Sequence, residues 1–136
     1  MKIKQIAALP FGVVAFVLLG FTQADEILTK ENGATVINTS SLATDVEGYV
    51  GPTPLKIYIK AGTVEKIEPL ENYETPKYFA LVKRHLLQKW NGLTAKKAAA
   101  LKVDVATGAT YSSTAVIENV KRGLEFYNKK GKKKPR

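Results

Sequence analysis

The pattern that most restricts the fold is a strict two-residue alternation on one side of a short turn. Residues 55–60 read LKIYIK, so apolar and polar side chains would face opposite sides of a half-buried strand. Ala61-Gly62 supplies a turn, and residues 63–68 (TVEKIE) would return as the hairpin partner before Pro69 ends the strand. The apolar face of this hairpin must be covered by other parts of the chain.

Helices in later segments are expected to cover this apolar face, because apolar residues recur in those segments at helical spacing. One helix is predicted from Pro76 to Asn91-Gly92, and the last helix from Ser113 to about Tyr127. A short helix from Ala95 to about Leu101 would be capped by Thr94.

The remaining segments complete the predicted fold. Residues 34–38 are expected to form a further strand, residues 25–32 to be irregular, and residues 102–105 to be a strand or an extended connector. The order of elements predicts an α+β class, in which an antiparallel, hairpin-based sheet packs against helices on one face.

Residues 1–24 have the order of a secretory signal peptide. Lys2 and Lys4 precede an apolar run from 6 to 21, and Ala24 offers a small residue at a cleavage site. The run is interrupted by proline and glycine and is shorter than the about 20 residues that usually span a membrane. We therefore expect export to the periplasm or the outer face of the cytoplasmic membrane, with an uncleaved anchor as the alternative.

The formal net charge of +9 is concentrated at the two ends of the chain. Residues 25–128, the expected folded domain, hold 13 Lys and Arg against all 12 Asp and Glu, whereas residues 129–136 hold six cations. We expect this basic tail to be disordered and to make weak, salt-sensitive contact with anionic membrane, or simply to keep the chain soluble. Export argues against a nucleic-acid partner. The chain has no Cys, which excludes disulfides and thiolate metal sites.

Residues 104–113 read DVATGATYSS and lie where the last helix begins. A helix N-terminus attracts phosphate through its free N–H groups and partial positive charge. Gly108 and Ala109 would let a ligand approach, and Thr107, Ser112 and Ser113 add hydroxyl donors on either side of them. The segment is therefore either a phosphate cradle or an ordinary helix start capped by Ser112 or Ser113. It lacks the spacing of a P-loop or a dinucleotide fingerprint.

The motif from Asp104 to Thr110 resembles the D-x-x-S/T-G-A-T/S motif of FMN-binding domains. These domains include those of the C subunit of sodium-pumping NADH:quinone reductase and the G subunit of Rnf-type complexes. The resemblance runs from about Gly48 to Tyr127 and includes a Gly-Tyr-x-Gly-Pro segment at 48–52. In that family a flavin transferase moves FMN from FAD onto the last Thr or Ser of the motif. The resemblance therefore implies a covalent phosphoester between FMN and Thr110.

The resemblance also implies which residues surround the cofactor. They are Asp104, Thr107, Gly108, Ala109, Thr110, Tyr111, Ser112 and Ser113 of the motif, together with Glu74, Thr75, Pro76 and Tyr78. Related quinone-reductase domains have Glu-Thr-Pro-Gly-Leu-Gly, whose glycines let the backbone lie close to the isoalloxazine ring. This chain has Lys77-Tyr78-Phe79 in place of Gly-Leu-Gly, so an aromatic wall is expected at the ring pocket.

The implied function is that of an exported, membrane-associated flavoprotein electron carrier, with the flavin transferase and membrane or envelope redox proteins as partners. No Ser-His pair, metal-binding cluster or reactive Cys indicates a substrate-specific enzyme. One alternative is a module at the cell envelope that binds FMN or another phosphate ligand without a covalent bond. A second alternative is a surface adaptor that acts through the Lys-rich tail.

Overall fold

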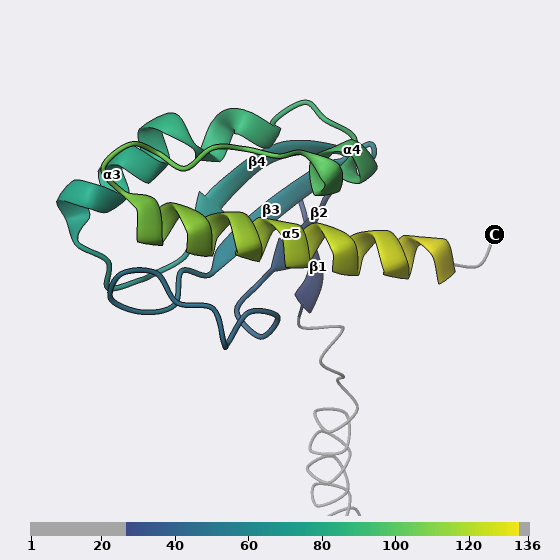
Figure 1. Cartoon of the computed structure of the whole chain (residues 1–136). Coiled ribbons are helices and arrows are strands. Elements are labelled where there is room, and N and C mark those ends of the chain that lie inside the picture. Colours follow the sequence, from purple (N-terminus) through teal and green to yellow (C-terminus); the bar gives the residue numbers. More distant parts are fainter. Residues whose placement is uncertain (1–26, 134–136) are drawn as a thin grey trace, which may run out of the picture.

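The computed structural model of the chain describes residues 27–133 (Figure 1). Its four strands form one antiparallel sheet in the order β1-β2-β3-β4, with bounds Leu28–Glu31, Ala34–Asn38, Leu55–Lys60 and Thr63–Pro69. The predicted hairpin is confirmed as β3 and β4. The predicted signal peptide, residues 1–24, lies outside the described residues.

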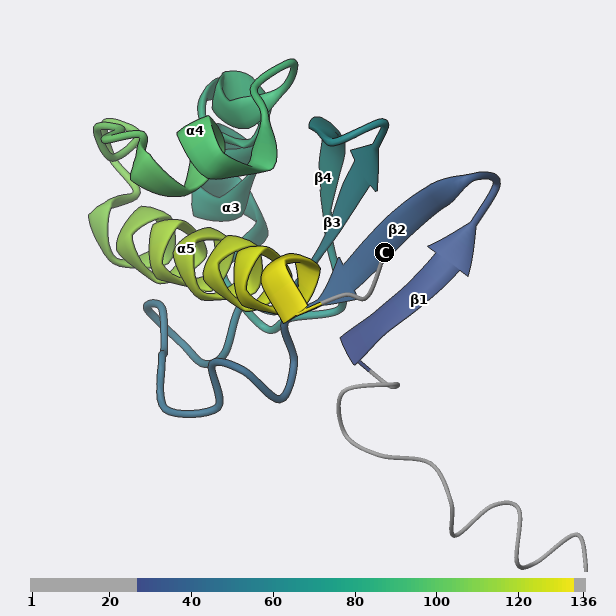
Figure 2. The same cartoon turned by 90° about the vertical axis from the view of Figure 1, so that its right-hand side faces the viewer.

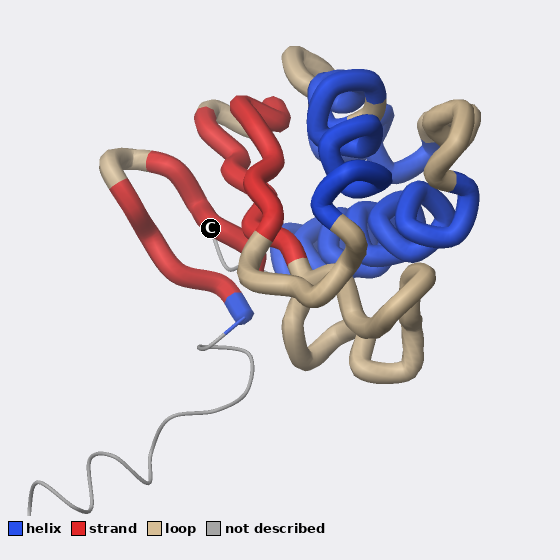
Figure 3. The backbone as a smooth tube through the Cα atoms, turned by 90° about the vertical axis from the view of Figure 1, so that its left-hand side faces the viewer, coloured by secondary structure: helices blue, strands red, loops and turns tan. Residues whose placement is uncertain are grey.

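The helices gather on one side of the sheet (Figure 2). In chain order they are α3, η1, α4 and α5, with bounds Pro76–His85, Leu87–Trp90, Ala95–Ala100 and Thr110–Lys133. The longest helix, α5, packs against β2 and β3 and contacts α3 and α4 (Figure 3). The α+β class predicted from the sequence is confirmed.

The strand β1 was not predicted, because residues 25–32 were expected to be irregular. It pairs with β2 so that Glu31 lies opposite Ala34, which leaves Asn32-Gly33 as a two-residue turn. Both turn residues have positive φ, 50° for Asn32 and 84° for Gly33. Asn-Gly is a favoured sequence for such hairpin turns, since both residues tolerate the left-handed region. The sequence at 32–33 therefore indicates this hairpin, although the polar residues of β1 show no strand pattern.

The helix boundaries differ from the prediction at three places. The helix that starts at Pro76 ends at His85 and is followed by the 3₁₀ turn η1. Thr94 caps α4 as predicted, and its Oγ1 accepts a hydrogen bond from the Lys97 N–H at 3.2 Å. The last helix starts at Thr110 rather than Ser113, and it continues to Lys133. Residues 129–133 are therefore helical, which corrects the expectation of a tail disordered from residue 129.

The core lies between the sheet and the helices. Its buried side chains include Ile57 of β3, Leu86 at the end of α3, Trp90 of η1 and Leu124 of α5. Burial of a Leu or Ile side chain contributes about 1.5–3 kcal/mol, so this layer holds the helices on the sheet. Within residues 27–133 the structure contains no helix with the length and apolar character needed to cross a membrane.

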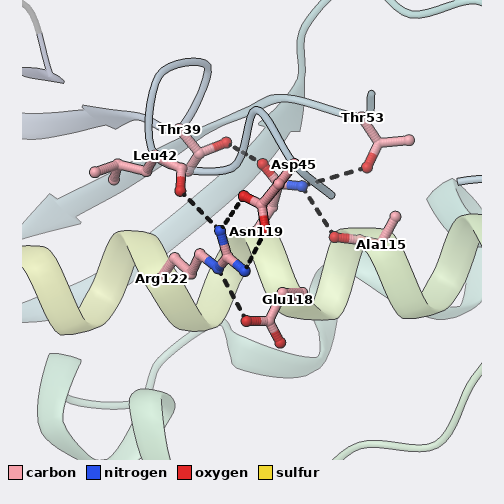
Figure 4. Close-up of polar contacts among 8 residues, drawn as sticks. All are labelled: Thr39, Leu42, Asp45, Thr53, Ala115, Glu118, Asn119 and Arg122. Atoms are coloured by element: carbon pink, nitrogen blue, oxygen red, sulfur yellow. Dashed lines mark hydrogen bonds and ion pairs between the residues drawn. The ribbon is translucent and has the colours of Figure 1, made fainter. Parts of the chain in front are cut away.

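A polar cluster attaches the loop between β2 and β3 to α5 (Figure 4). Asn119 is buried; its Oδ1 accepts a hydrogen bond from the Thr39 hydroxyl, and its Nδ2 donates to the Ala115 carbonyl at 2.9 Å. One turn later, Arg122 donates to both carboxylate oxygens of Asp45, at 2.6 and 3.1 Å. The loop is thus fixed to the middle of α5 before it reaches Gly48.

Gly123 allows α5 to lie close to the sheet. A Cβ atom on Gly123 would lie 2.8 Å from Ile57 Cδ1 and 3.0 Å from Thr39 Cγ2, distances that require neighbours to move. We predict that Gly123→Val lowers the free energy of unfolding by about 1–3 kcal/mol through overpacking. Chemical denaturation followed by circular dichroism measures this.

The matched control is Lys121→Val, which places the same β-branched side chain at an exposed position of α5. Equal destabilisation by the two substitutions would contradict overpacking against β3 as the cause of the loss at Gly123.

Candidate functional site

A folded-back turn precedes α5 and exposes the first residue of that helix. The Ala109 N–H donates to the Ala106 carbonyl at 2.9 Å, and the Ala106 N–H donates to Ser113 Oγ at 3.0 Å. Gly108 has a φ of 90°, and a Cβ atom there would lie 3.2 Å from Leu81 Cδ1. Both the backbone conformation and the neighbour therefore favour glycine at this position.

The N-cap of α5 is Ala109, since its carbonyl accepts the first helical hydrogen bond, from the Ser113 N–H at 2.9 Å. The predicted alternative of an ordinary cap made by Ser112 or Ser113 therefore does not describe this helix. The first-turn N–H groups of Thr110, Tyr111 and Ser112 lie beyond the reach of intrahelical acceptors. Together with the helix dipole they can bind an anion at this end of α5.

The hydroxyl groups of the motif divide into an exposed and a buried set. Thr107, Thr110 and Tyr111 are exposed, whereas Ser112 and Ser113 are buried. Ser113 Oγ accepts from the turn that precedes the helix, and the Ser112 hydroxyl donates to Glu74. The two serine side chains are thus engaged in holding the turn and the helix start in place.

Glu74 is a buried carboxylate, only 4% exposed, that joins three segments. It accepts hydrogen bonds from the backbone N–H groups of Tyr49, Val50 and Gly51, at 2.8, 2.7 and 2.9 Å, and from the Ser112 hydroxyl. Burial acts to raise the pKa of Glu74, but the hydrogen bonds from Ser112 and from the three N–H groups outweigh it and hold the pKa below its ordinary value.

Glycine is required where the loop crosses this carboxylate. A Cβ atom on Gly48 would lie 2.5 Å from Glu74 Oε1, so no other residue fits without displacing the side chain. The packing against Glu74 therefore explains the first glycine of the Gly-Tyr-x-Gly-Pro segment, because the backbone of this segment surrounds a buried anion.

The start of α3 places one aromatic residue in the core and one at the surface. Pro76 is the first residue of α3, and the Thr75 carbonyl accepts from the N–H groups of Tyr78 and Phe79 at 3.0 and 2.9 Å. Phe79 is buried, while Tyr78 is partly exposed. Of the residues that replace Gly-Leu-Gly, only Tyr78 lines the pocket described next.

A pocket of about 200 Å³ brings these segments together. It is lined by Tyr49, Tyr78, Gly108, Ala109, Thr110, Tyr111 and Ser112. The rings of Tyr49 and Tyr111 are 6.0 Å apart between centroids, with 33° between their planes. Tyr49 was not among the predicted site residues, although the Gly-Tyr-x-Gly-Pro segment that contains it had been noted.

The other predicted residues lie around this pocket without lining it. Asp104 and Thr107 line a neighbouring pocket of about 320 Å³ together with Leu81, His85 and Lys89. Glu74 and Pro76 line a separate hollow together with residues 69–72, and Thr75 is the N-cap of α3. The structure thus gathers Tyr78 and residues 108–112 at one pocket, with Asp104 and Thr107 beside it.

Comparison with known proteins identifies a protein family. A family model described as an FMN-binding domain matches residues 48–125, which is more than half of the 136-residue chain. The matched range begins at the loop that surrounds Glu74 and includes the turn before α5. The searches of curated proteins and of solved structures each returned no match.

The contacts of Glu74 predict a pH-dependent contribution to stability. Because its pKa is lowered by folding, the ionised carboxylate stabilises the fold above its ordinary pKa of 4.5, and this contribution is lost as the pH falls below that value. We predict that Glu74→Gln lowers the free energy of unfolding at neutral pH by about 1–3 kcal/mol, because an amide cannot accept from all four donors. The difference in free energy of unfolding between the parent and Glu74→Gln should become smaller as the pH is lowered. Urea denaturation at a series of pH values measures it.

Glu47→Gln is the matched control, since Glu47 is an exposed carboxylate in the loop between β2 and β3, whose residues 49–51 donate to Glu74. A deficit for Glu74→Gln that stays constant from neutral to acidic pH would contradict the assignment of an ionised, hydrogen-bonded Glu74.

Proposed function

Because the chain belongs to the FMN-binding domain family, we propose that it is an exported flavoprotein electron carrier whose FMN is attached through a phosphoester to Thr110. The main support for this acceptor is that Thr110 is exposed at the start of α5 and lines the pocket that also contains three tyrosines. FMN supplies the redox chemistry, while the chain binds and orients it.

The residues around Thr110 suit a phosphodiester. Such a group carries one negative charge, which a helix N-terminus stabilises by about 0.3–1 kcal/mol. Gly108 and Ala109 present little side chain beside the hydroxyl, so the phosphate can approach the backbone. The carboxylate of Glu74 is buried and accepts four hydrogen bonds, which limits its repulsion of a nearby anion.

The attachment needs FAD and a flavin transferase. Thr110 Oγ forms a bond to the phosphorus of the FMN half of FAD, the pyrophosphate P–O bond breaks, and AMP leaves while the hydroxyl proton is released. The exposure of Thr110 supports this step because the transferase must reach the oxygen. Ser112 and Ser113 are buried and hydrogen-bonded, which makes them poor acceptors.

The proposed partners are membrane or envelope redox proteins. The signal-peptide pattern of residues 1–24 supports export, and the basic residues at the C-terminal end support weak attraction to an anionic membrane surface. Both would keep a small electron carrier near its partners.

We predict that Thr110→Ala, coexpressed with a flavin transferase, gives a folded protein that completely lacks covalent flavin. The parent chain should show the mass of the processed polypeptide plus one FMN less water, and its flavin should stay with the polypeptide on a denaturing gel. Intact-mass spectrometry and in-gel fluorescence measure both.

Thr107→Ala is the matched control, because Thr107 is an exposed hydroxyl three residues away that lines the neighbouring pocket. It should weaken flavin attachment without abolishing it. Flavin that remains covalently bound in Thr110→Ala would refute the assignment of the acceptor. Flavin that copurifies with the parent chain but dissociates on denaturation would favour the non-covalent alternative.

A further inference from the structure

Three tyrosines from three different segments line the pocket that contains Thr110. Tyr49 comes from the loop before β3, Tyr78 from α3 and Tyr111 from α5. Tyr49 is 64% exposed and Tyr111 67% exposed, although large aromatic side chains ordinarily bury most of their surface. Exposed apolar side chains gathered at one place indicate a ligand that covers them.

The segments that carry Tyr49 and Tyr111 are joined by hydrogen bonds to Glu74. The Tyr49 N–H donates to Glu74 Oε1 at 2.8 Å, and the hydroxyl of Ser112, the neighbour of Tyr111, donates to the same oxygen. One carboxylate oxygen therefore links the backbone of Tyr49 to the side chain of Ser112, the residue next to Tyr111. Because the backbone is anchored, the rings lie together without needing to be buried.

The geometry of the pair favours a flat aromatic ligand. The ring centroids are 6.0 Å apart and the planes are tilted by 33°, so the rings are not stacked in parallel. Each side chain is more than 60% exposed, which leaves ring surface open to a ligand. Electron-rich phenol rings bind an electron-poor planar ring system by offset stacking. The isoalloxazine ring of FMN is such a system, and the short ribityl phosphate chain on Thr110 would hold it at this pocket.

We infer that Tyr49 and Tyr111 form an aromatic platform on which the isoalloxazine ring stacks. The inference rests on the proposed attachment of FMN to Thr110 and adds the residues that position the ring. A stacked phenol also quenches flavin fluorescence: the excited flavin takes an electron from the phenol ring and returns it without emitting light. The platform therefore has a spectroscopic signature that does not depend on electron-transfer activity.

The test measures fluorescence yield per bound FMN in the flavinylated protein and its variants. Tyr49→Leu and Tyr111→Leu should each raise the yield several-fold, because each removes one stacked phenol. Tyr73→Leu is the matched control, since Tyr73 is 75% exposed in the same region but does not line the pocket. Its yield should equal that of the parent protein, and thermal melting should show that all three variants are folded.

Two outcomes would overturn the platform. Yields that are equal in Tyr49→Leu, Tyr111→Leu and the parent would show that neither ring contacts the flavin. Unchanged yields with impaired flavinylation by the transferase would assign the exposed tyrosines to protein docking instead.

The intact mass of each sample separates this inference from the proposed function. A parent protein without the added mass of FMN contradicts covalent attachment. The platform is then tested with added free FMN, whose fluorescence the parent should quench more strongly than Tyr49→Leu or Tyr111→Leu; equal quenching overturns it.

Discussion

The arrangement of the site depends on one buried carboxylate. A buried charge is costly unless its hydrogen-bonding capacity is filled, and Glu74 meets this requirement with three backbone N–H groups and one hydroxyl. These donors come from two segments that are far from Glu74 in sequence: the loop at 49–51 and the start of α5. The carboxylate therefore stabilises the fold and also fixes the position of the loop at 49–51 relative to Thr110.

A second polar cluster holds the same loop from its other end. The loop leaves β2 at Thr39, whose hydroxyl donates to Asn119, and the Leu42 carbonyl and the Asp45 carboxylate both accept from Arg122 (Figure 4). Both partners lie on α5. The long connection between β2 and β3 is thus attached to α5 near its middle and, through Glu74, near its start. Attachment at two places along one helix limits how far Tyr49 can move from the pocket.

The sequence predicted those parts of the fold that depend on local pattern. The alternation at 55–60 predicted β3, and the cap at Thr94 predicted the start of α4. The strand β1 was not predicted because its polar residues lack a strand pattern. Its pairing with β2 is specified by the Asn32-Gly33 turn. The extent of α5 to Lys133 was missed because a run of like charges was given more weight than continuation of the helix.

The site could be predicted only in part, for a related reason. Local sequence at 104–113 indicated a turn of small residues before a helix, whereas the choice of Thr110 came from the resemblance of the motif to FMN-binding domains. The link between Glu74 and Ser112 joins residues that are 38 positions apart, and spacing along the chain carries no sign of it. The role of Ser112 as a buried donor, and the place of Tyr49 at the pocket, therefore emerge only when the three segments are packed together.

The same packing gives a physical basis for choosing one acceptor among several neighbouring hydroxyls. A transferase can modify only an oxygen that it can reach and that is not already used to hold the fold. Burial and hydrogen bonding remove Ser112 and Ser113, while Thr107 faces a different pocket from Thr110. The tyrosine next to Thr110 is exposed, but its phenol oxygen lies at the end of a long side chain, away from the first-turn N–H groups that favour a phosphate. The selectivity proposed for Thr110 thus follows from the burial, the hydrogen bonds and the different pocket that set the neighbouring hydroxyl groups apart from it.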